Sequence, residues 1–262
     1  MLTEAQQLQY LSRIEHALLA ATNAANQFRA GAFELRDHGG RNVVTEVDRR
    51  ICDLLRTELV RPEEAWLSEE DPDDRARLGC ELCWVVDPLD GTREFVDGIP
   101  EWCISVALVE NGIAIAGGTS NPATNEIFLG ALGCGVTRNG ETVQQTNRAS
   151  LDGALVLASR SEWKRGEWRY AEQKQFAVQP MGSVAYKLSR VAAGLADATW
   201  TLSPKHEWDI AAGVALVRSA GGCIHSPDTS ELRFNRSNPL LPGLIACGPN
   251  LWPEISSLLS GV

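Results

Sequence analysis

The sequence has no apolar run long enough to cross a bilayer, so no transmembrane helix is expected. It also lacks basic character: 24 Lys and Arg residues stand against 34 Asp and Glu residues, and the formal net charge is -10. Nucleic acid grooves rely on basic residues, so we expect neither a nucleic acid polymer nor a membrane as partner. Residues 1–26 are polar and helix-periodic rather than signal-like, which favours a cytoplasmic protein.

Cysteine pairs suited to metal or disulfide chemistry are scarce. The seven cysteines are scattered and odd in number, which favours reduced thiols in a chain without an export signal. Cys80 and Cys83 form a single CxxC, but a zinc site would need a second pair or nearby histidines. We therefore expect both residues to be simply buried.

The apolar periodicity predicts two lobes with the chemistry between them. In the first lobe, 1–150, it predicts helices at 3–30 and 45–59, a mobile loop at 36–41, strands at 65–68, 82–86, 104–109, 113–118 and 126–129, and a hairpin at 135–140. In the second lobe, 151–262, strands at 154–158, 176–178, 198–202 and 244–247 alternate with helices at 163–173, 184–193 and 208–220 and a last helix.

The most informative stretch is Asp87-Pro88-Leu89-Asp90-Gly91-Thr92, which follows the apolar run at 82–86. Two carboxylates therefore stand at the end of a buried strand. Carboxylate oxygens are preferred ligands of hard divalent cations, and the hydroxyl and flexible backbone that follow suit an oxyanion such as phosphate. Taken alone, a DxxD would be better interpreted as an acidic surface turn.

Other acidic residues at predicted element boundaries change that interpretation. Glu69 and Glu70 end a strand, Asp48 lies in a first helical turn, and Asp209 opens a helix. Each has a structural alternative: Asp209 as a helix cap, Asp48 as an acid serving its own helix, and Glu70 as solvated charge, like Asp71. Phosphoryl transfer gives them a common purpose, because carboxylate-held metal ions neutralise phosphate and activate water.

Two other phosphate-handling machineries are excluded by the sequence. There is no glycine loop ending in Gly-Lys-Ser/Thr. The DxDGT motif of aspartyl-phosphate phosphatases has its nucleophilic Asp two residues before the second Asp, where this chain has Pro88. Direct attack by a metal-bound water remains, with N–H groups after Gly91 available to phosphate oxygens.

The motifs together resemble one family: the lithium-sensitive, magnesium-dependent phosphomonoesterases. It includes inositol monophosphatases, fructose-1,6-bisphosphatases and CysQ-type 3'(2'),5'-bisphosphate nucleotidases. The matching segments are 68–70 (Ser-Glu-Glu), 87–92, 182–183, 135–140 and 208–213 (Trp-Asp-Ile-Ala-Ala-Gly). The resemblance spans nearly the whole chain and implies an α+β fold, a layered α-β-α-β-α sandwich. Family members often form homodimers, so a homodimer and lithium inhibition are implied too.

The resemblance also implies a metal site. Glu69, Asp87 and the Leu89 carbonyl would bind the first Mg²⁺ ion, while Asp87, Asp90 and Asp209 would surround the second. Glu69 would also reach a weaker third ion. Every one of these positions carries the residue that the family pattern requires.

Further residues are implied for catalysis and for substrate binding. Thr92 paired with Asp48 would position and activate the attacking water, with Glu69 contributing to catalysis through the metals. The Gly91 and Thr92 amides would bind phosphate oxygens. Ser183, in the matching Gly-Ser turn, and Asp209 are expected near the substrate.

Three details favour a nucleotidase over an inositol monophosphatase. Arg93 precedes Glu-Phe, as in the nucleotidases, and is either a ligand of a second phosphate or an exposed helix arginine. Glu207 precedes Trp-Asp, as in CysQ-type enzymes, and is expected at the substrate. Leu202 stands where inositol monophosphatases place an acidic residue. Lys205 and His206 depart from the CysQ pattern and are either substrate contacts or loop surface residues, of which we favour the loop surface.

These observations predict a magnesium-dependent phosphomonoesterase acting on a small phosphorylated metabolite. The favoured substrate is adenosine 3',5'-bisphosphate or its sulfated precursor. Inositol monophosphate is the alternative, with sugar phosphates behind it. A metal- or nucleotide-binding regulator without turnover is a second class of function, which the Asp48 and Thr92 pair disfavours.

Overall fold

The computed structural model describes residues 2–28, 35–38, 42–73, 75–171, 175–228 and 230–260, with the backbone alone at 35–38 and 42–45. A short antiparallel pair, β1 (Leu35–His38) and β2 (Asn42–Thr45), occupies most of the described part of the N-terminal connection. Residues 36–38 of the expected mobile loop are therefore strand, because their backbone pairs with 42–44. Residues 39–41 lie outside the described part.

The first large sheet has seven strands that lie in sequence order. They are β3 (Glu64–Ser68), β4 (Leu82–Asp90), β5 (Cys103–Glu110), β6 (Ile113–Asn121), β7 (Glu126–Ala131), β8 (Gly135–Arg138) and β9 (Glu141–Val143). The β3–β4 pair is parallel, and every following pair is antiparallel.

The second sheet has five strands in the order β11 (Ala177–Met181), β10 (Leu155–Ser159), β12 (Ala198–Thr201), β16 (Leu244–Cys247) and β14 (Cys223–His225). A separate small pair joins β13 (Lys205–His206) to β15 (Leu240–Leu241). The two large sheets thus come from residues 64–143 and 155–247. The helix α6 (Glu207–Ser219) comes from the second half of the chain but packs on the first sheet. A lobe boundary at residue 150 therefore stays a prediction.

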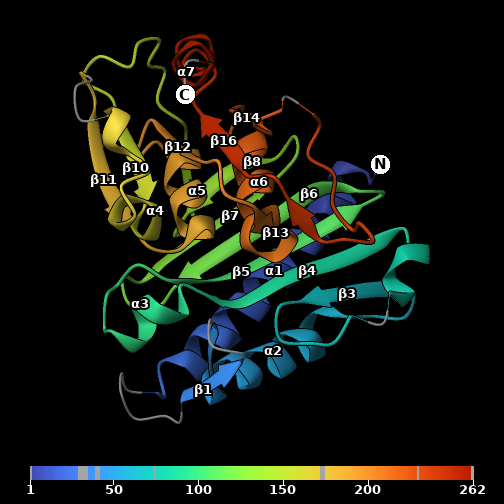
Figure 1. Cartoon of the computed structure of the whole chain (residues 1–262). Coiled ribbons are helices and arrows are strands. Elements are labelled where there is room, and N and C mark those ends of the chain that lie inside the picture. Colours follow the sequence, from blue (N-terminus) through green and yellow to red (C-terminus); the bar gives the residue numbers. More distant parts are fainter. Residues whose placement is uncertain are drawn as a thin grey trace.

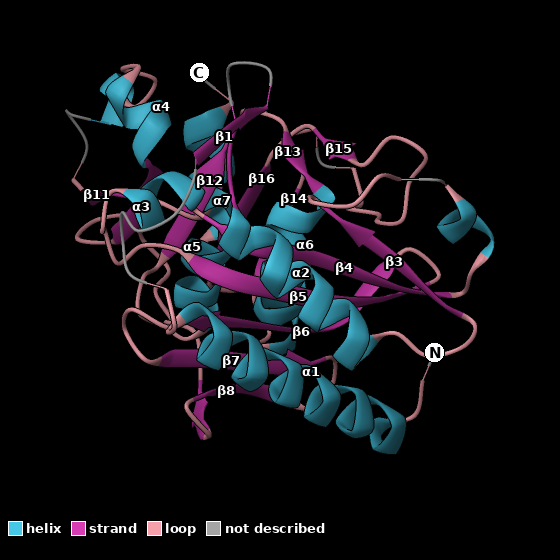
Figure 2. Ribbon diagram, turned by 90° about the horizontal axis from the view of Figure 1, so that it is seen from below, coloured by secondary structure: helices cyan, strands magenta, loops and turns pink. Residues whose placement is uncertain are grey.

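Helices and sheets alternate as layers (Figure 1). The helices α1 (Glu4–Ala25) and α2 (Glu46–Leu59) cover one face of the seven-stranded sheet, as the view from below shows (Figure 2). The helices α5 (Val184–Ala192) and α6 lie between the two sheets, and α7 (Trp252–Leu259) packs on the outer face of the second. This is the expected layered α-β-α-β-α sandwich.

Alternation along the strands explains the layers. On β4, Cys83 and Val85 pack toward α5 and α6, whereas Trp84 and Val86 pack toward α1 and α2. Gly117 on β6 lets α6 approach closely, since a Cβ there would lie 2.8 Å from the Ala212 carbonyl oxygen. The sheet is therefore buried on both faces, as its almost continuous apolar sequence requires.

Some expected elements are shorter than the periodicity suggested. The first helix begins after its cap Thr3 and ends at Ala25. The expected helix at 163–173 is wrong: a short α4 (Arg160–Lys164) is followed by a 3-10 turn at 169–171, because Gly166 adopts a left-handed φ of 78°. No described helix has both the length and the apolar character needed to cross a membrane. Cys83 is buried, as expected, whereas Cys80 is only partly buried and packs against the same core.

Candidate active site

The parallel β3–β4 pair brings the first two acidic residues together. Its register places Ser68 opposite Val86, so Glu69 and Asp87 follow on neighbouring strands at the same edge of the sheet. The strand β4 is central and apolar up to this point, which delivers the Asp87 carboxylate at the end of a buried strand.

A β-bulge then aligns Asp90 with Asp87. Asp87 and Asp90 are three residues apart, so on a regular strand their side chains would point to opposite faces of the sheet. Here Asp87 pairs with Ser105 and Asp90 with Cys103, so β4 has one more residue than β5 in between. The extra residue restores the alternation, and both carboxylates face the layer of α5 and α6. The spacing of the DxxD motif thus depends on this bulge.

Gly91 turns the chain directly after the bulge. Its φ is 100°, and a Cβ at this position would lie 3.0 Å from the Glu101 carbonyl oxygen. The short helix α3 (Thr92–Val96) begins at once, and the Thr92 hydroxyl donates to the Leu89 carbonyl oxygen at 3.1 Å. Glycine is therefore required both by the backbone conformation and by the space.

Two helix N-termini complete the acidic group. Asp209 is the third residue of α6, and its carboxylate accepts the His206 backbone N–H at 3.0 Å. Asp90 accepts the Ser183 hydroxyl and the Ala185 N–H, both at 2.7 Å, at the start of α5. Asp209 is thus a helix-capping residue that also faces the pocket.

Three carboxylates converge to metal-binding distance. Glu69, Asp87 and Asp209 each offer an oxygen, and these three oxygens lie within 4.8 Å of one another. Asp90 lines the same pocket, as does Leu89. We call Glu69, Asp87, Asp90 and Asp209 the acidic wall. Carboxylates with a backbone carbonyl nearby form the hard oxygen set that fits Mg²⁺, so the residues present suit that ion.

The charges of the acidic wall oppose one another. Burial raises the pKa of Asp87 well above its usual range, and Glu69, Asp90 and Asp209 raise it further. Glu69 is an exposed residue, but its carboxyl group is desolvated in the pocket; this, then Asp209, raises its pKa to about 8. Burial and Asp90 raise the pKa of Asp209 to about 7. A bound cation would relieve this repulsion.

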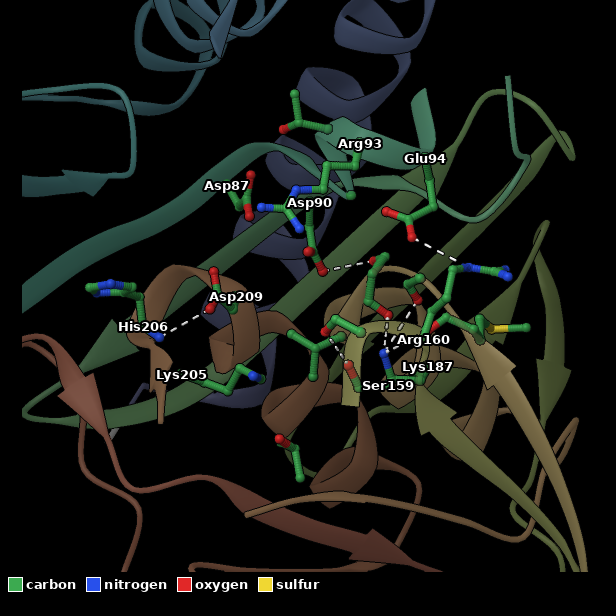
Figure 3. Close-up of a pocket in the computed structure, with 18 of the residues that line it drawn as sticks. Asp87, Asp90, Arg93, Glu94, Ser159, Arg160, Lys187, Lys205, His206 and Asp209 are labelled. Atoms are coloured by element: carbon green, nitrogen blue, oxygen red, sulfur yellow. Dashed lines mark hydrogen bonds and ion pairs between the residues drawn. The ribbon is translucent and has the colours of Figure 1, made fainter. Parts of the chain in front are cut away.

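The acidic wall is one side of a pocket of about 370 Å³ (Figure 3). The other side comes from the second sheet and its connections. Five of the residues that line the pocket on this side, three of them basic, form a set that we call the cationic wall: Ser159, Arg160, Lys187, Thr201 and Lys205. The pocket therefore lies between side chains of the two sheets, with acidic groups on one wall and donor groups on the other.

Arg160, in α4, contacts α3 and the connection between α3 and β5. Its Nε lies 3.5 Å from Glu94 Oε1, and its Nη2 contacts the Glu101 carboxylate, which also accepts the Gly182 N–H at 2.8 Å. Arg160 and the buried Lys187 were not found by sequence reasoning. Arg160 has no motif around it, and Lys187 lies in an amphipathic helix without a motif.

Most predicted site residues line the pocket. They are Glu69, Asp87, Leu89, Asp90, Gly91, Thr92, Arg93, Ser183 and Asp209. Arg93 points from α3 toward Asp87 and Asp90 in Figure 3. The Ser183 hydroxyl donates to Asp90 and accepts the Tyr186 N–H at 3.0 Å, so it orients the carboxylate.

Two predicted residues lie away from the pocket lining. Asp48 is buried in α2, and its charge raises the pKa of Glu70. Glu207 is fully buried, and its carboxylate accepts the backbone N–H groups of Asn235 and Arg236 at 2.6 and 2.9 Å. In the structure Glu207 therefore holds a loop and is not among the residues that line the pocket, so its contact with substrate stays a prediction.

Of the two loop residues beside Asp209, His206 is exposed, as favoured, whereas Lys205 is only partly exposed. Lys205 and His206 both line the pocket, because the pairing of β13 with β15 turns this segment inward. The His206 ring stacks on Trp208 with centroids 4.4 Å apart and planes 2° apart. Asp71 is not simply solvated charge either, since it accepts the Trp66 Nε1–H at 2.7 Å.

Comparison with known proteins agrees with the fold. The model of the inositol monophosphatase family matches residues 5–256. An inositol-1-monophosphatase of Rhizobium meliloti is 34% identical over 241 residues, which cover 84% of this chain and 88% of that protein. A 3'-phosphoadenosine 5'-phosphate phosphatase of Mycobacterium bovis is 33% identical over 211 residues, covering 79% and 78%.

Solved structures repeat the same two classes. The inositol monophosphatase from Anabaena (Nostoc) sp. PCC 7120 aligns with a TM-score of 0.80 at 25% identity, covering 99% of this chain and 98% of that one. CysQ from Bacteroides thetaiotaomicron aligns with a TM-score of 0.77 at 25% identity, covering 93% and 98%. The chain belongs to the inositol monophosphatase family, whose members are metal-dependent phosphatases of small phosphorylated metabolites.

Proposed function

We propose that this protein is a magnesium-dependent phosphomonoesterase that removes the 3'-phosphate of adenosine 3',5'-bisphosphate or its sulfated precursor. The charge of the pocket carries this choice. Five carboxylates and four Lys or Arg side chains line it, so its formal charge is -1. Two divalent cations would bring it to +3, which exceeds the charge of one phosphate monoester dianion. A substrate with a second anionic group would match this pocket better.

The acidic wall is the proposed metal site. Glu69, Asp87 and the Leu89 carbonyl would hold one Mg²⁺ ion, Asp87, Asp90 and Asp209 a second, and Glu69 a weaker third. The ions would neutralise phosphate charge and lower the pKa of a bound water. The protein's own part is to fix the oxygens. The Ser183 hydroxyl and the Ala185 N–H do this for Asp90.

Thr92 is proposed to orient the attacking water. Its hydroxyl proton is directed at the Leu89 carbonyl, which leaves the oxygen lone pairs available to accept a hydrogen bond from water. Transfer of a proton onward to Asp48 would require this hydroxyl to turn away from Leu89. The backbone N–H groups of Gly91 and Thr92 and the Arg93 guanidinium are the proposed ligands of the reacting phosphate.

Three alternatives are supported by specific relatives. Inositol monophosphate is one, since an inositol-1-monophosphatase is as similar to this chain as the nucleotide phosphatase. Sugar phosphates follow from a relative named fructose-1,6-bisphosphatase/inositol-1-monophosphatase, 33% identical over 191 residues. A regulator without turnover follows from a Nus factor SuhB that is 36% identical over 151 residues.

Phosphate release separates these functions. Adenosine 3',5'-bisphosphate and inositol 1-phosphate would be compared by kcat/KM with Mg²⁺ present, and again with EDTA in excess. We expect hydrolysis of the nucleotide to be faster and to stop with EDTA. A preference for the inositol ester would overturn the substrate assignment. No release from either ester, nor from a sugar phosphate, would support the regulator.

A further inference from the structure

We propose that Lys205 binds the second anionic group of the substrate and thereby selects bisphosphates over monophosphates. This assignment rests on the proposed phosphatase function and names the residue that sets its substrate class. The sequence pointed instead to Arg93 as the ligand of a second phosphate. The positions of the two side chains in the pocket argue for assigning the second anionic group to Lys205 and the reacting phosphate to Arg93.

Lys205 is held inside the pocket wall. It lies on β13, which pairs with β15, and its side chain is 20% exposed. Its Nζ is 3.7 Å from Glu162 Oε1, which is an ion-pair distance and too long for a hydrogen bond. Glu162 itself accepts the Thr201 hydroxyl and the Trp168 Nε1–H. The Lys205 ammonium group is therefore anchored by charge and retains N–H donors for a ligand.

A second cation reinforces the same wall. Lys187, which lines the same pocket, is buried. Its Nζ lies 3.0 to 3.4 Å from the carbonyl oxygens of Met181, Gly182 and Ser183. The charge of Lys205 is among the causes that lower the pKa of Lys187, so the two ammonium groups repel each other. The chain has only four lysines, and two of them face this pocket.

Like charges brought together in a pocket favour an anion between them or beside them. The Lys187 ammonium group donates its hydrogen bonds to backbone carbonyls, so it contributes a positive charge at a fixed position. Lys205 has the donors to make the contact. The hydroxyls of Ser159 and Ser161, 3.0 Å apart, line the same pocket and add donors. A phosphate or sulfate accepts hydrogen bonds only, which matches this set.

Arg93 stands on the other side of the pocket. Figure 3 shows it pointing toward Asp87 and Asp90, while Lys205 lies below Asp209, on the side of Lys187 and Ser159. A group bound by Arg93 would thus be the phosphate held at the acidic wall. A group bound by Lys205 would be a different one on the same molecule. The pocket therefore fits a substrate with two separated anionic groups.

A matched pair of substrates tests this assignment. Adenosine 3'-monophosphate and adenosine 3',5'-bisphosphate differ only by the second phosphate. For Lys205→Met we expect kcat/KM on the bisphosphate to fall by about 10- to 100-fold, the usual size for a lost hydrogen bond to a charged group. The rate on the monophosphate should change less than about twofold, which also shows that the variant is folded.

Two further variants complete the experiment. Lys205→Arg should restore most of the preference, since it keeps the positive charge. Lys164→Met removes an exposed lysine of α4 that is not in the pocket lining, and it should leave both rates unchanged.

The outcomes separate the inference from the function on which it rests. If Lys205→Met lowers both substrates equally, or neither, the second-anion assignment is wrong while the phosphatase stands. If the wild-type protein hydrolyses the two nucleotides equally well, the assignment is also wrong. If it hydrolyses neither nucleotide and no other phosphate ester, the proposed function itself is wrong.

Discussion

The two walls of the pocket are built in different ways. The acidic wall comes from strand ends and helix starts whose residues stand in short motifs, and its geometry follows from a strand register and one bulge. The cationic wall is assembled from single residues on β10, β12, β13, α4 and α5, without a motif. We assign the metal-dependent chemistry to the first wall and the choice of substrate to the second.

Breaking the acidic wall should have the largest effect. Asp90→Asn removes a charge while keeping the shape that accepts from Ser183 and Ala185. We expect kcat to fall by at least about 100-fold, as it does when an electrostatic group at a transition state is lost. Stopped assays of phosphate release with Mg²⁺ measure the rate.

A suitable control for this variant is Asp97→Asn, an exposed acid at the end of α3. It makes the same chemical change near the pocket and should keep wild-type activity. Wild-type turnover by Asp90→Asn would remove Asp90 from the metal site.

Removing the metal should expose the repulsion within the acidic wall. Without metal, the raised pKa values of Glu69 and Asp209, about 8 and about 7, mean that the folded protein binds more protons than the unfolded chain. Stability should then fall as pH rises from about 4, the unfolded pKa, to about 8. Mg²⁺ at 100 times its Kd would add about 2.7 kcal/mol.

Thermal melting tests this pH dependence. At pH 8 we expect Mg²⁺ to raise Tm by about 5 to 10 °C over the EDTA sample. At pH 5 the protonated carboxylates should bind the metal weakly, so the difference should shrink. Equal Tm differences at both pH values would contradict the coupling between protonation and metal binding.

Removing the ion pairs of Arg160, a residue of the cationic wall, should have a moderate effect on stability. Arg160→Gln removes the contacts to Glu94 and Glu101, and the guanidinium is only 26% exposed. The loss should be about 1 to 3 kcal/mol, or a Tm decrease of about 2 to 12 °C. Arg165→Gln is the control, because its pair with Glu167 is exposed on both sides and should contribute less than about 1 kcal/mol. Equal effects of the two variants would mean that the contacts of Arg160 with Glu94 and Glu101 stabilise the fold no more than an exposed ion pair.

The same contrast explains what could be predicted from the sequence. Glu69, Asp87, Asp90 and Asp209 stand at element boundaries, where periodicity and acidic residues coincide, and the structure brings all four to one pocket. The bulge that aligns Asp87 with Asp90 has no sequence code beyond the Pro-Leu insertion itself. It becomes visible only through its pairing with β5.

The failures of prediction have a common physical cause. The sequence favoured the loop surface over a substrate contact for Lys205, because a two-residue strand, β13, is too short for any periodicity, and its partner β15 lies 35 residues away. The expected helix at 163–173 does not form because Gly166 has a left-handed backbone conformation. Tertiary pairing and single backbone conformations, rather than local propensity, decide such positions.

Glu207 gives the smallest expected effect and the sharpest contrast with Lys205, two residues away. Sequence resemblance placed Glu207 at the substrate, whereas its carboxylate accepts two backbone N–H groups of the loop at 235–236. Glu207→Gln keeps one acceptor oxygen, so we expect a loss of about 1 kcal/mol in stability. The kcat/KM on adenosine 3',5'-bisphosphate should change less than about twofold. Melting curves and kinetics on the same sample measure both. A tenfold loss of kcat/KM at unchanged Tm would mean that Glu207 contacts the substrate after all. Glu207 rather than Lys205 would then be the residue of this segment that determines specificity.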